Sequence, residues 1–256
     1  MAFKGKVVLI TGGGSGMGQL AARRFAKDGK QVAIFDINEA GLNETKKGSA
    51  NIHSWVVDIT DANAVKSAVE AVEAKLGPVD RLYNAAAIMP FGKLVEFSPE
   101  ATMRMMEINY GGLVNITHAV LPGMVERGRG DFISFASVAG LLPTMLTGAY
   151  SASKAAVAFY TEILYHENID SGVRFACVCP PPVATPLLQQ GKDTVWPKQI
   201  DKAATIDPSM VIDQIDKHLD KGKFWVYPNR EAWFGSFMRR MVPDLIWKEN
   251  HRVEGF

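Results

Sequence analysis

Residues 11 to 18 read Thr11-Gly12-Gly13-Gly14-Ser15-Gly16-Met17-Gly18. They follow the apolar run Val7–Ile10 directly and lead into a helix-like stretch, Gly18–Lys27. Glycines at such a turn let the backbone and the first turn of the helix approach a pyrophosphate closely. A glycine-rich string alone is common in loops. The order strand, glycines, helix is the context that indicates a dinucleotide-binding βαβ unit.

Short apolar runs rich in Val and Ile recur along the rest of the chain, with helix-like stretches between most of them. The predicted strands are Val7–Ile10, Gln31–Phe35, Ile52–Val57, Val79–Tyr83, Asp131–Phe135, Val173–Val178 and Phe224–Tyr227. The predicted helices include Gly18–Lys27, Ala62–Leu76, Thr102–Leu121 and Tyr150–His166. Such alternation indicates parallel strands with helices on both faces. No linker interrupts it, so we expect one α/β domain over residues 1–256, a doubly wound parallel sheet (Rossmann fold) of about seven strands.

The composition is that of an ordinary globular protein, with 47% hydrophobic and 21% charged residues and a formal net charge of +1. This charge gives no field that would attract nucleic acid or an anionic membrane. No apolar stretch is long enough for a transmembrane helix, and the run Val7–Ile10 is too short for a signal peptide. We expect Cys177 and Cys179 to be buried, reduced thiols and the protein to be cytoplasmic. The five histidines are scattered, so no metal site is expected.

Two segments depart from the regular alternation. Residues 180–208 contain six prolines, so little of this segment can be continuous helix, and we expect a substrate loop that acts as a lid. Residues 229–256 form an expected helical extension that Pro243 kinks or breaks. Its apolar stripe consists of Trp233, Phe234, Phe237, Met238, Met241, Val242, Leu245 and Ile246.

Three interpretations of this apolar stripe remain open. It can pack on its own domain or on a sister subunit, which we prefer, or it can cover an apolar substrate. It can also touch a membrane, but a net charge of +1 over residues 230–256 gives little attraction to anionic lipid.

Asp36 closes the second predicted strand, about 20 residues after the glycine string, where dinucleotide folds place the acid that binds the adenosine ribose. Its carboxylate can accept hydrogen bonds from the ribose hydroxyls and would repel a 2′-phosphate. No Arg or Lys stands at position 15 or 37 to bind that phosphate. The alternative is a solvated turn aspartate. In this context we prefer NAD to NADP as the cofactor.

The segment Tyr150-Ser151-Ala152-Ser153-Lys154 places a phenol and an ammonium four residues apart, on one face of a helix. A phenol has a reference pKa near 10, which is too high for a base at neutral pH. A neighbouring ammonium, together with a positively charged oxidised nicotinamide, would lower that pKa. Alone, a Tyr and a Lys at this spacing are usually just helix surface.

Taken together, these motifs resemble those of the short-chain dehydrogenase/reductase family over essentially the whole chain. The family's Thr-Gly-x-x-x-Gly-x-Gly matches residues 11–18, and its Tyr-x-x-x-Lys matches Tyr150 and Lys154. Its catalytic serine matches Ser137, thirteen residues before the tyrosine. Its helix-four asparagine matches Asn109, and the aspartate that receives the adenine amino group matches Asp58.

The resemblance implies an oxidoreductase that transfers a hydride between NAD and an alcohol or ketone. Tyr150 would be the general acid/base, and Ser137 would position the substrate oxygen. Lys154 would hold the nicotinamide ribose and lower the tyrosine's pKa. Asn109 would anchor a water that relays the proton to solvent. The implied NAD-binding residues are Gly12, Ser15, Gly16, Met17, Gly18, Asp36, Ile37, Asp58, Ile59, Asn84, Ala85, Ala86, Tyr150, Lys154, Pro180, Val183 and Thr185.

The chain departs from the family pattern in three places. Asn-Asn-Ala-Gly after the fourth strand appears as Asn84-Ala85-Ala86-Ala87, and Pro-Gly after the sixth appears as Pro180-Pro181. The Val-Asp-Gly-Gly that many members carry near the C-terminus is replaced by Phe224-Trp225-Val226-Tyr227-Pro228. These departures affect the loop geometry and the substrate, and they leave the catalytic set intact.

The substrate itself is not specified by these motifs. Bulky apolar residues in the two variable regions favour a hydrophobic secondary alcohol or ketone, and these are Met89, Phe91, Met145, Leu146, Leu187, Leu188 and Trp196. A homodimer or homotetramer is expected, because family members commonly pair the helices that hold Asn109 and Tyr150.

The sequence is less consistent with three alternative functions. Asp36 argues against an NADPH-dependent ketone reductase. The joint presence of Ser137, Tyr150 and Lys154 argues against a non-catalytic protein that senses dinucleotides. A sugar-nucleotide epimerase usually needs a larger C-terminal domain than this chain provides.

Overall fold

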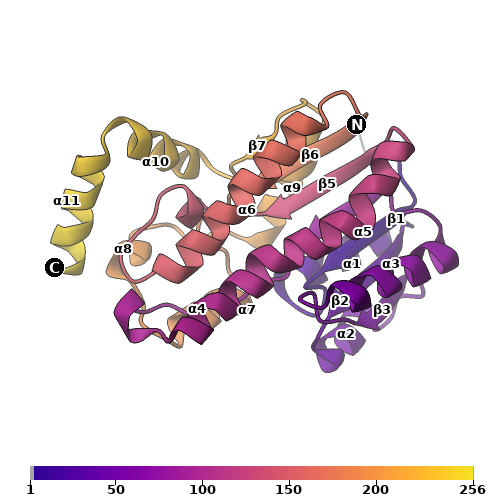
Figure 1. Cartoon of the computed structure of the whole chain (residues 1–256), viewed down its shortest axis with the longest axis horizontal. Helices are drawn as coiled ribbons and strands as arrows, with labels where there is room; N and C mark the ends of the chain where they lie inside the picture. Colours follow the sequence, from indigo (N-terminus) through magenta and orange to yellow (C-terminus); the bar gives the residue numbers. More distant parts are fainter. Residues whose placement is uncertain (1–2, 256) are drawn as a thin grey trace.

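Seven parallel strands form a single sheet in the computed structural model, which describes residues 3–255 (Figure 1). Within that range the strand order is β3-β2-β1-β4-β5-β6-β7, so the predicted doubly wound α/β fold is confirmed. The strands are β1 (Val7–Thr11), β2 (Gln31–Asp36), β3 (Ile52–Val56), β4 (Arg81–Asn84), β5 (Gly130–Phe135), β6 (Val173–Val178) and β7 (Trp225–Val226).

Helices cover both faces of this sheet, and each side has its own apolar core. On one face lie α3 (Ala62–Leu76), α5 (Gly112–Glu126) and α6 (Gly148–Glu167), which pack side chains such as Val69, Ile116 and Val157 against the strands. On the other lie α1 (Gly16–Lys27), α2 (Glu39–Lys46) and α9 (Pro208–Leu219), with Phe25, Leu42 and Ile212. Strands buried on both faces explain why the strand sequences are almost continuously apolar.

The sheet order reverses at β1, which pairs with β2 on one side and with β4 on the other. The connections therefore leave β1 and β4 in opposite directions, and the loops at their carboxyl ends separate. Ligands in open α/β sheets bind in the crevice at such a reversal. The glycine string lies at this point, because it follows β1 directly.

The predicted helix Thr102–Leu121 contains a local widening. The segment consists of α4 (Pro99–Met106), a single π-helical turn (Glu107–Gly111) and α5. A π-turn inserts one extra residue into the helical repeat and frequently occurs at functional sites. Asn109 lies within this turn.

The proline-rich segment 180–208 contains two short helices, α7 (Pro186–Lys192) and α8 (Lys198–Asp201). Its ends are joined by a parallel bridge between Val183 and Ile206. The main-chain N–H of Ile206 also donates to the carbonyl oxygen of Pro182 at 2.9 Å. The segment is therefore anchored at its base and carries its helices over the carboxyl edge of the sheet.

The C-terminal extension forms two helices, α10 (Arg230–Met241) and α11 (Pro243–Glu254), which extend beyond the end of the sheet (Figure 1). The break occurs at Val242, immediately before Pro243. The apolar stripe does not pack as a whole on its own domain, because five residues of the stripe are 46–62% exposed. These are Trp233, Phe234, Phe237, Met241 and Leu245. The buried residues of α11 are polar instead, Asn250 and Glu254.

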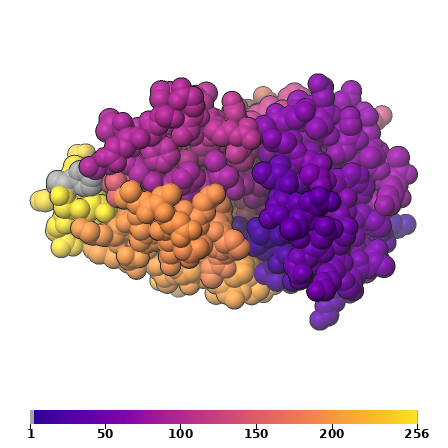
Figure 2. Space-filling model, turned by 90° about the horizontal axis from the view of Figure 1, so that it is seen from below, coloured from indigo at the N-terminus to yellow at the C-terminus, as the bar shows by residue number. Residues whose placement is uncertain are grey.

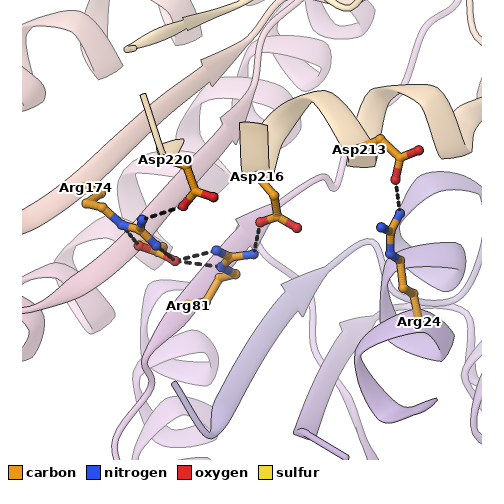
Figure 3. A network of polar contacts seen from close by, with 7 residues as sticks. Arg24, Arg81, Arg174, Asp213, Asp216 and Asp220 are labelled. Carbon is orange, nitrogen blue, oxygen red and sulfur yellow. Dashed lines mark hydrogen bonds and ion pairs between the residues drawn. The ribbon is translucent and has the colours of Figure 1, made fainter. Parts of the chain in front are cut away.

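A network of arginines and aspartates ties α9 to the amino ends of the strands (Figure 3). Arg81 on β4 is only 1% exposed and binds Asp131 on β5 at 2.6 Å and Asp216 on α9 at 2.6 Å. Arg174 on β6 reaches the same Asp131 carboxylate at 2.6 Å. A buried cation with two carboxylates in hydrogen-bond contact is satisfied, whereas removing one partner would leave a poorly compensated charge.

Within residues 3–255, no helix is long and apolar enough to cross a membrane. No group of three His, Cys, Asp or Glu side chains in that range is placed to hold a metal ion. Cys177 and Cys179 are both free thiols with no exposed surface.

Candidate active site

Two adjoining cavities lie at the carboxyl edge of the sheet. The first, of ≈ 310 Å³, borders the glycine string, and we call it the glycine-loop cavity. The second, of ≈ 170 Å³, contains Tyr150, and we call it the tyrosine cavity. They share the lining residues Met17, Ala85, Ala87, Thr185 and Leu187. Molecules bound in the two cavities would therefore meet at these side chains.

The glycines form a close-packed turn that side chains would obstruct. Gly12 has φ +68°, and a Cβ atom there would lie 2.9 Å from the backbone of Ala86. A Cβ atom on Gly18 would lie 2.2 Å from the carbonyl oxygen of Gly12. The loop can take this shape only with glycine at these positions.

The start of α1 has no side-chain cap. Ser15 precedes the helix in an extended conformation without capping it, and the first turn has no acidic residue. Other helices of this chain are capped by a side chain, for example α3 by Asp61 and α9 by Asp207. The free N–H groups of α1 therefore face the glycine-loop cavity, as a pyrophosphate-binding helix requires. A dinucleotide fits this loop.

Asp36 lies at the end of β2 on the wall of the glycine-loop cavity. One carboxylate oxygen accepts a hydrogen bond from Gly14 N at 2.9 Å, and the other accepts one from Asn38 N at 2.9 Å. Each oxygen retains lone pairs that can accept further hydrogen bonds. The two backbone contacts fix the carboxylate in place at the cavity wall, and the neighbouring Ile37 is exposed.

Asp58 lines the other end of the glycine-loop cavity, next to Ile59. The backbone N–H and the hydroxyl of Thr60 both donate to it, and these hydrogen bonds lower the pKa of the carboxyl group. Arg104 lies 3.5 Å from Asp58 and 3.3 Å from Glu107. It is the one cation among the described residues that line this cavity, and sequence reasoning missed it because no motif marks it.

Tyr150 and Ser137 lie together on the wall of the tyrosine cavity. Tyr150 comes from the first turns of α6, and Ser137 follows β5. Burial raises the pKa of the Tyr150 phenol to about 12, and a hydrogen bond with Ser137 acts in the opposite direction. The phenol is therefore protonated at neutral pH.

Lys154 lies one helical turn after Tyr150, as the spacing predicts, and is 4% exposed. Its Nζ donates to the carbonyl oxygen of Phe135 at 2.7 Å and lies 5.9 Å from the centre of the Tyr150 ring. Burial lowers the pKa of the ammonium to about 8. The sequence leads us to expect that Lys154 and an oxidised nicotinamide together lower the tyrosine pKa; in the protein alone, burial raises the pKa of Tyr150 and lowers that of Lys154.

Asn109 does not line either cavity. Its side-chain oxygen accepts from Ile88 N at 2.8 Å, and its amide donates to Ile88 O at 3.0 Å and to Ser153 Oγ at 2.9 Å. It thereby joins the π-turn, the loop after β4 and the helix of Tyr150. Ser153 stands within the quoted Tyr150–Lys154 segment, but sequence reasoning gave it no role.

The remaining predicted residues divide between the two cavities. Of the implied NAD-binding residues, those on the glycine-loop cavity are Gly12, Ser15, Gly16, Met17, Gly18, Asp36, Ile37, Asp58, Ile59, Ala85, Ala86 and Thr185. Those confined to the tyrosine cavity are Tyr150, Lys154, Pro180 and Val183. Asn84 lines neither, because its side chain is buried and accepts a hydrogen bond from Thr11 Oγ1 at 2.7 Å.

The walls of the tyrosine cavity are mostly apolar. Five of the seven bulky residues singled out in the sequence line it, namely Met89, Phe91, Leu187, Leu188 and Trp196, whereas Met145 and Leu146 do not. Sequence reasoning missed Thr144, Gln199 and Ile200, which also line it. A third hollow of ≈ 760 Å³ lies between β7 and α10 and shares no lining residue with either cavity, so size alone does not identify the site.

The fold and these residues correspond to a known family. The family model for short chain dehydrogenase matches residues 6–196. The chain belongs to the short-chain dehydrogenase family.

Two relatives of this short-chain dehydrogenase match it over most of their length. An uncharacterised oxidoreductase of Staphylococcus saprophyticus is 32% identical over 230 residues, which are 87% of this chain and 97% of the relative. Estradiol 17-beta-dehydrogenase 11 of Pongo abelii is 30% identical over 248 residues, 94% of this chain and 80% of the relative.

Solved structures of the same fold also superpose on most of this chain. A short-chain dehydrogenase from Streptomyces avermitilis superposes with a TM-score of 0.85 at 25% identity, covering 99% of this chain and 98% of that one. A 3-ketoacyl-(acyl-carrier-protein) reductase from Brucella melitensis, complexed with NADH, gives 0.80 at 26% identity, covering 87% and 96%.

The departures of this short-chain dehydrogenase from the family pattern are accommodated locally. Ala86 N donates to Thr11 Oγ1 at 3.2 Å, so the loop after β4 remains tied to β1 although Ala85 and Ala87 flank it. The methyl groups of both alanines line the junction of the two cavities. Pro181 lines the tyrosine cavity, and Pro180 O accepts from Val138 N at 3.1 Å, which anchors that loop.

Proposed function

We propose that this short-chain dehydrogenase is an NAD-dependent oxidoreductase that interconverts a hydrophobic secondary alcohol and its ketone, with Tyr150 as the general acid/base. One observation carries the proposal. A buried phenol, with Ser137 and Lys154 beside it, lines an apolar cavity that adjoins a second cavity built from an uncapped helix and glycines. The relative named as an estradiol dehydrogenase is consistent with a hydrophobic alcohol.

The protein's own residues provide the proton chemistry. A nicotinamide, when bound, supplies the hydride donor or acceptor and, in its oxidised form, a positive charge. Tyr150, protonated at neutral pH, can donate its proton to the oxygen of a ketone, while Ser137 holds that oxygen by a hydrogen bond. Acid/base catalysis of this kind contributes about 10²- to 10⁴-fold. In the reverse direction the phenol must lose its proton, which the charge of Lys154 would favour.

NAD is the preferred cofactor in this proposal because of Asp36. Two like charges about 4 Å apart repel by about 4 kcal/mol at an effective dielectric near 20. A 2′-phosphate beside this carboxylate would meet such repulsion, and Arg104 is already paired with Asp58 and Glu107. Allowing for screening, we expect NAD to be preferred by about two to three orders of magnitude.

The decisive test of catalysis is the variant Tyr150→Phe. It is expected to bind NADH with an unchanged Kd and to lose nearly all turnover of a ketone panel. Tyr165→Phe, at an aromatic position on the same helix, is the matched control and should keep wild-type kcat. If Tyr150→Phe kept kcat within a few-fold of the wild-type value, the proposed mechanism would be wrong. If the protein were a non-catalytic dinucleotide sensor, even the wild type would show no turnover.

The cofactor assignment is tested separately. Replacing Asp36 by Ala and Ile37 by Arg removes the repulsion and adds a cation, so the ratio of kcat/KM for NAD over NADP is expected to fall or reverse. Equal use of both cofactors by the wild type would instead favour the NADPH-dependent reductase.

Two further features belong to the proposal. We place the protein in a reducing compartment such as the cytoplasm, on the basis of the buried free thiols Cys177 and Cys179. We also propose a homodimer or homotetramer, supported by Phe159 and Ile163, which lie one turn apart on α6 and are both exposed. Light scattering that showed only monomer at micromolar concentration would contradict this assembly.

A further inference from the structure

Gln199 places a polar group in the wall of the tyrosine cavity. Its side-chain oxygen is buried and has no hydrogen-bond partner among residues 3–255. Its side-chain amide nitrogen also donates to no residue in that range. A buried amide oxygen without a hydrogen-bond donor is unfavourable, and in native proteins such groups call for an explanation, such as a ligand.

The other polar side chains of this cavity, apart from the catalytic pair Tyr150 and Ser137, already have partners. Thr144 donates to Asn250 on α11, and Lys154 donates to Phe135 O. Thr147 donates to Thr144 O at 2.7 Å, and Thr185 donates to Val183 O at 3.3 Å. Among the described lining residues, Gln199 is therefore the uncommitted polar group outside the catalytic pair.

The C-terminal helix holds Gln199 in position. The carboxylate of Glu254, at the end of α11, accepts hydrogen bonds from Gln199 N at 2.7 Å and from Lys198 N at 3.1 Å. Glu254 is only 9% exposed. Because α8 is four residues long, it is too short to be stable alone, and this carboxylate satisfies its first N–H groups.

The two segments lie next to each other at one end of the molecule. In Figure 2 the yellow C-terminal residues border the orange segment that leads from β6 to β7 and includes α8. In a second contact with α11, the Thr144 hydroxyl, which also lines this cavity, donates a hydrogen bond to Asn250. The C-terminal extension thus contacts residues that line the tyrosine cavity. It does so through two buried polar side chains, Asn250 and Glu254, and not through its apolar stripe.

We propose that Gln199 is a specificity-determining residue that binds a hydroxyl group on the substrate, remote from the reacting carbon, and that Glu254 positions it. A hydroxyl both donates and accepts hydrogen bonds, so it matches both halves of the amide. The substrate class is then a hydrophobic diol or hydroxyketone. This inference rests on the proposed function, since it concerns the same cavity.

The test compares matched methyl ketones of five to nine carbons with counterparts that carry a hydroxyl on the terminal carbon, reduced with NADH. The full-length wild type is expected to show a kcat/KM about tenfold higher for the hydroxyketone at the best chain length, the size of effect expected of one buried hydrogen bond. Gln199→Leu keeps the side-chain volume and is expected to bring this ratio to about one. The same ratio in the wild type and Gln199→Leu would overturn the inference.

Glu254→Gln tests the positioning role, because glutamine keeps the shape and loses one of the two acceptors. Its KM for the hydroxyketone is expected to rise several-fold, with the KM of the plain ketone, the kcat values and the Kd of NADH unchanged. Glu249→Gln on the same helix is the control, since within residues 3–255 its carboxylate binds Lys202 and Arg252 and no lining residue of the cavity. A general loosening of the fold would raise both KM values together and would contradict a specific role.

The possible failures are distinguishable. No turnover of any ketone by the wild type would overturn the proposed function and this inference with it. Turnover of both ketone series at equal efficiency would overturn the inference alone.

Discussion

Lys154→Met is expected to make the protein more stable and catalytically inactive. Lys154 carries an ammonium that is almost fully buried and, within residues 3–255, donates one hydrogen bond, to Phe135 O. Its location serves the chemistry of the tyrosine cavity at the expense of stability. Methionine removes the charge and keeps a flexible stem of similar volume.

The size of the effect follows from the pKa of Lys154. Burial lowers it from 10.5 to about 8, a difference that corresponds to about 3 kcal/mol. Between these two pH values the unfolded chain binds more protons than the folded one, so the folded state gains stability as the pH rises. The destabilisation is therefore complete below pH 8 and disappears above pH 10.5. Loss of the hydrogen bond to Phe135 offsets about 1 kcal/mol of the gain.

Urea unfolding at pH 7 and at pH 10 measures this difference. Lys154→Met is expected to be about 2 kcal/mol more stable than the wild type at pH 7 and about equal to it at pH 10. Lys221→Met, which removes an exposed ammonium after α9, controls for the loss of one charge. A stability difference that was the same at both pH values would refute the reasoning, because only the titration of Lys154 makes it depend on pH.

Three further predictions concern other parts of the molecule. Asp131→Asn is expected to lower the free energy of unfolding by about 3–5 kcal/mol, because Arg81 would stay buried and keep Asp216 as its charged partner. A loss below about 1 kcal/mol in urea unfolding would contradict this. Gly14→Ala would place a Cβ atom 2.9 Å from the Asp36 carboxylate, so we expect the KM for NAD to rise about tenfold, and an unchanged value would count against the role of Asp36. Since burial raises the pKa of Tyr150 to about 12, kcat/KM for alcohol oxidation is expected to rise from pH 6 to 8, and an oxidation maximum near pH 6 would exclude Tyr150 as the base.

Structural features that depend on residues close together in the sequence were predictable. All seven strands lie within about two residues of their predicted positions, because parallel strands buried on both faces leave continuous apolar runs. The glycine string and the spacing of Tyr150 and Lys154 are likewise local, since a turn and one helical repeat determine them. These patterns were sufficient to place most of the predicted residues on the two cavities.

Contacts between residues that are far apart in the sequence were not predictable. Gln199 and Glu254 are separated by 55 residues, and Thr144 and Asn250 by 106, so no periodicity connects them. The π-turn around Asn109 interrupts a sequence that has ordinary helical periodicity. Whether the pKa of Tyr150 is raised or lowered in the protein depends on how completely the fold excludes water from the phenol. The Tyr-x-x-x-Lys spacing does not reveal this.

The two edges of the sheet divide the tasks of the molecule. The amino ends of β4, β5 and β6 carry the arginines and aspartates that hold α9, whereas the carboxyl ends carry the loops around both cavities. A strand separates the two sets, so a change of side chain on one edge leaves the contacts of the other in place. Laboratory evolution aimed at residues 180–208 can therefore sample many new substrates while the opposite edge keeps the scaffold folded.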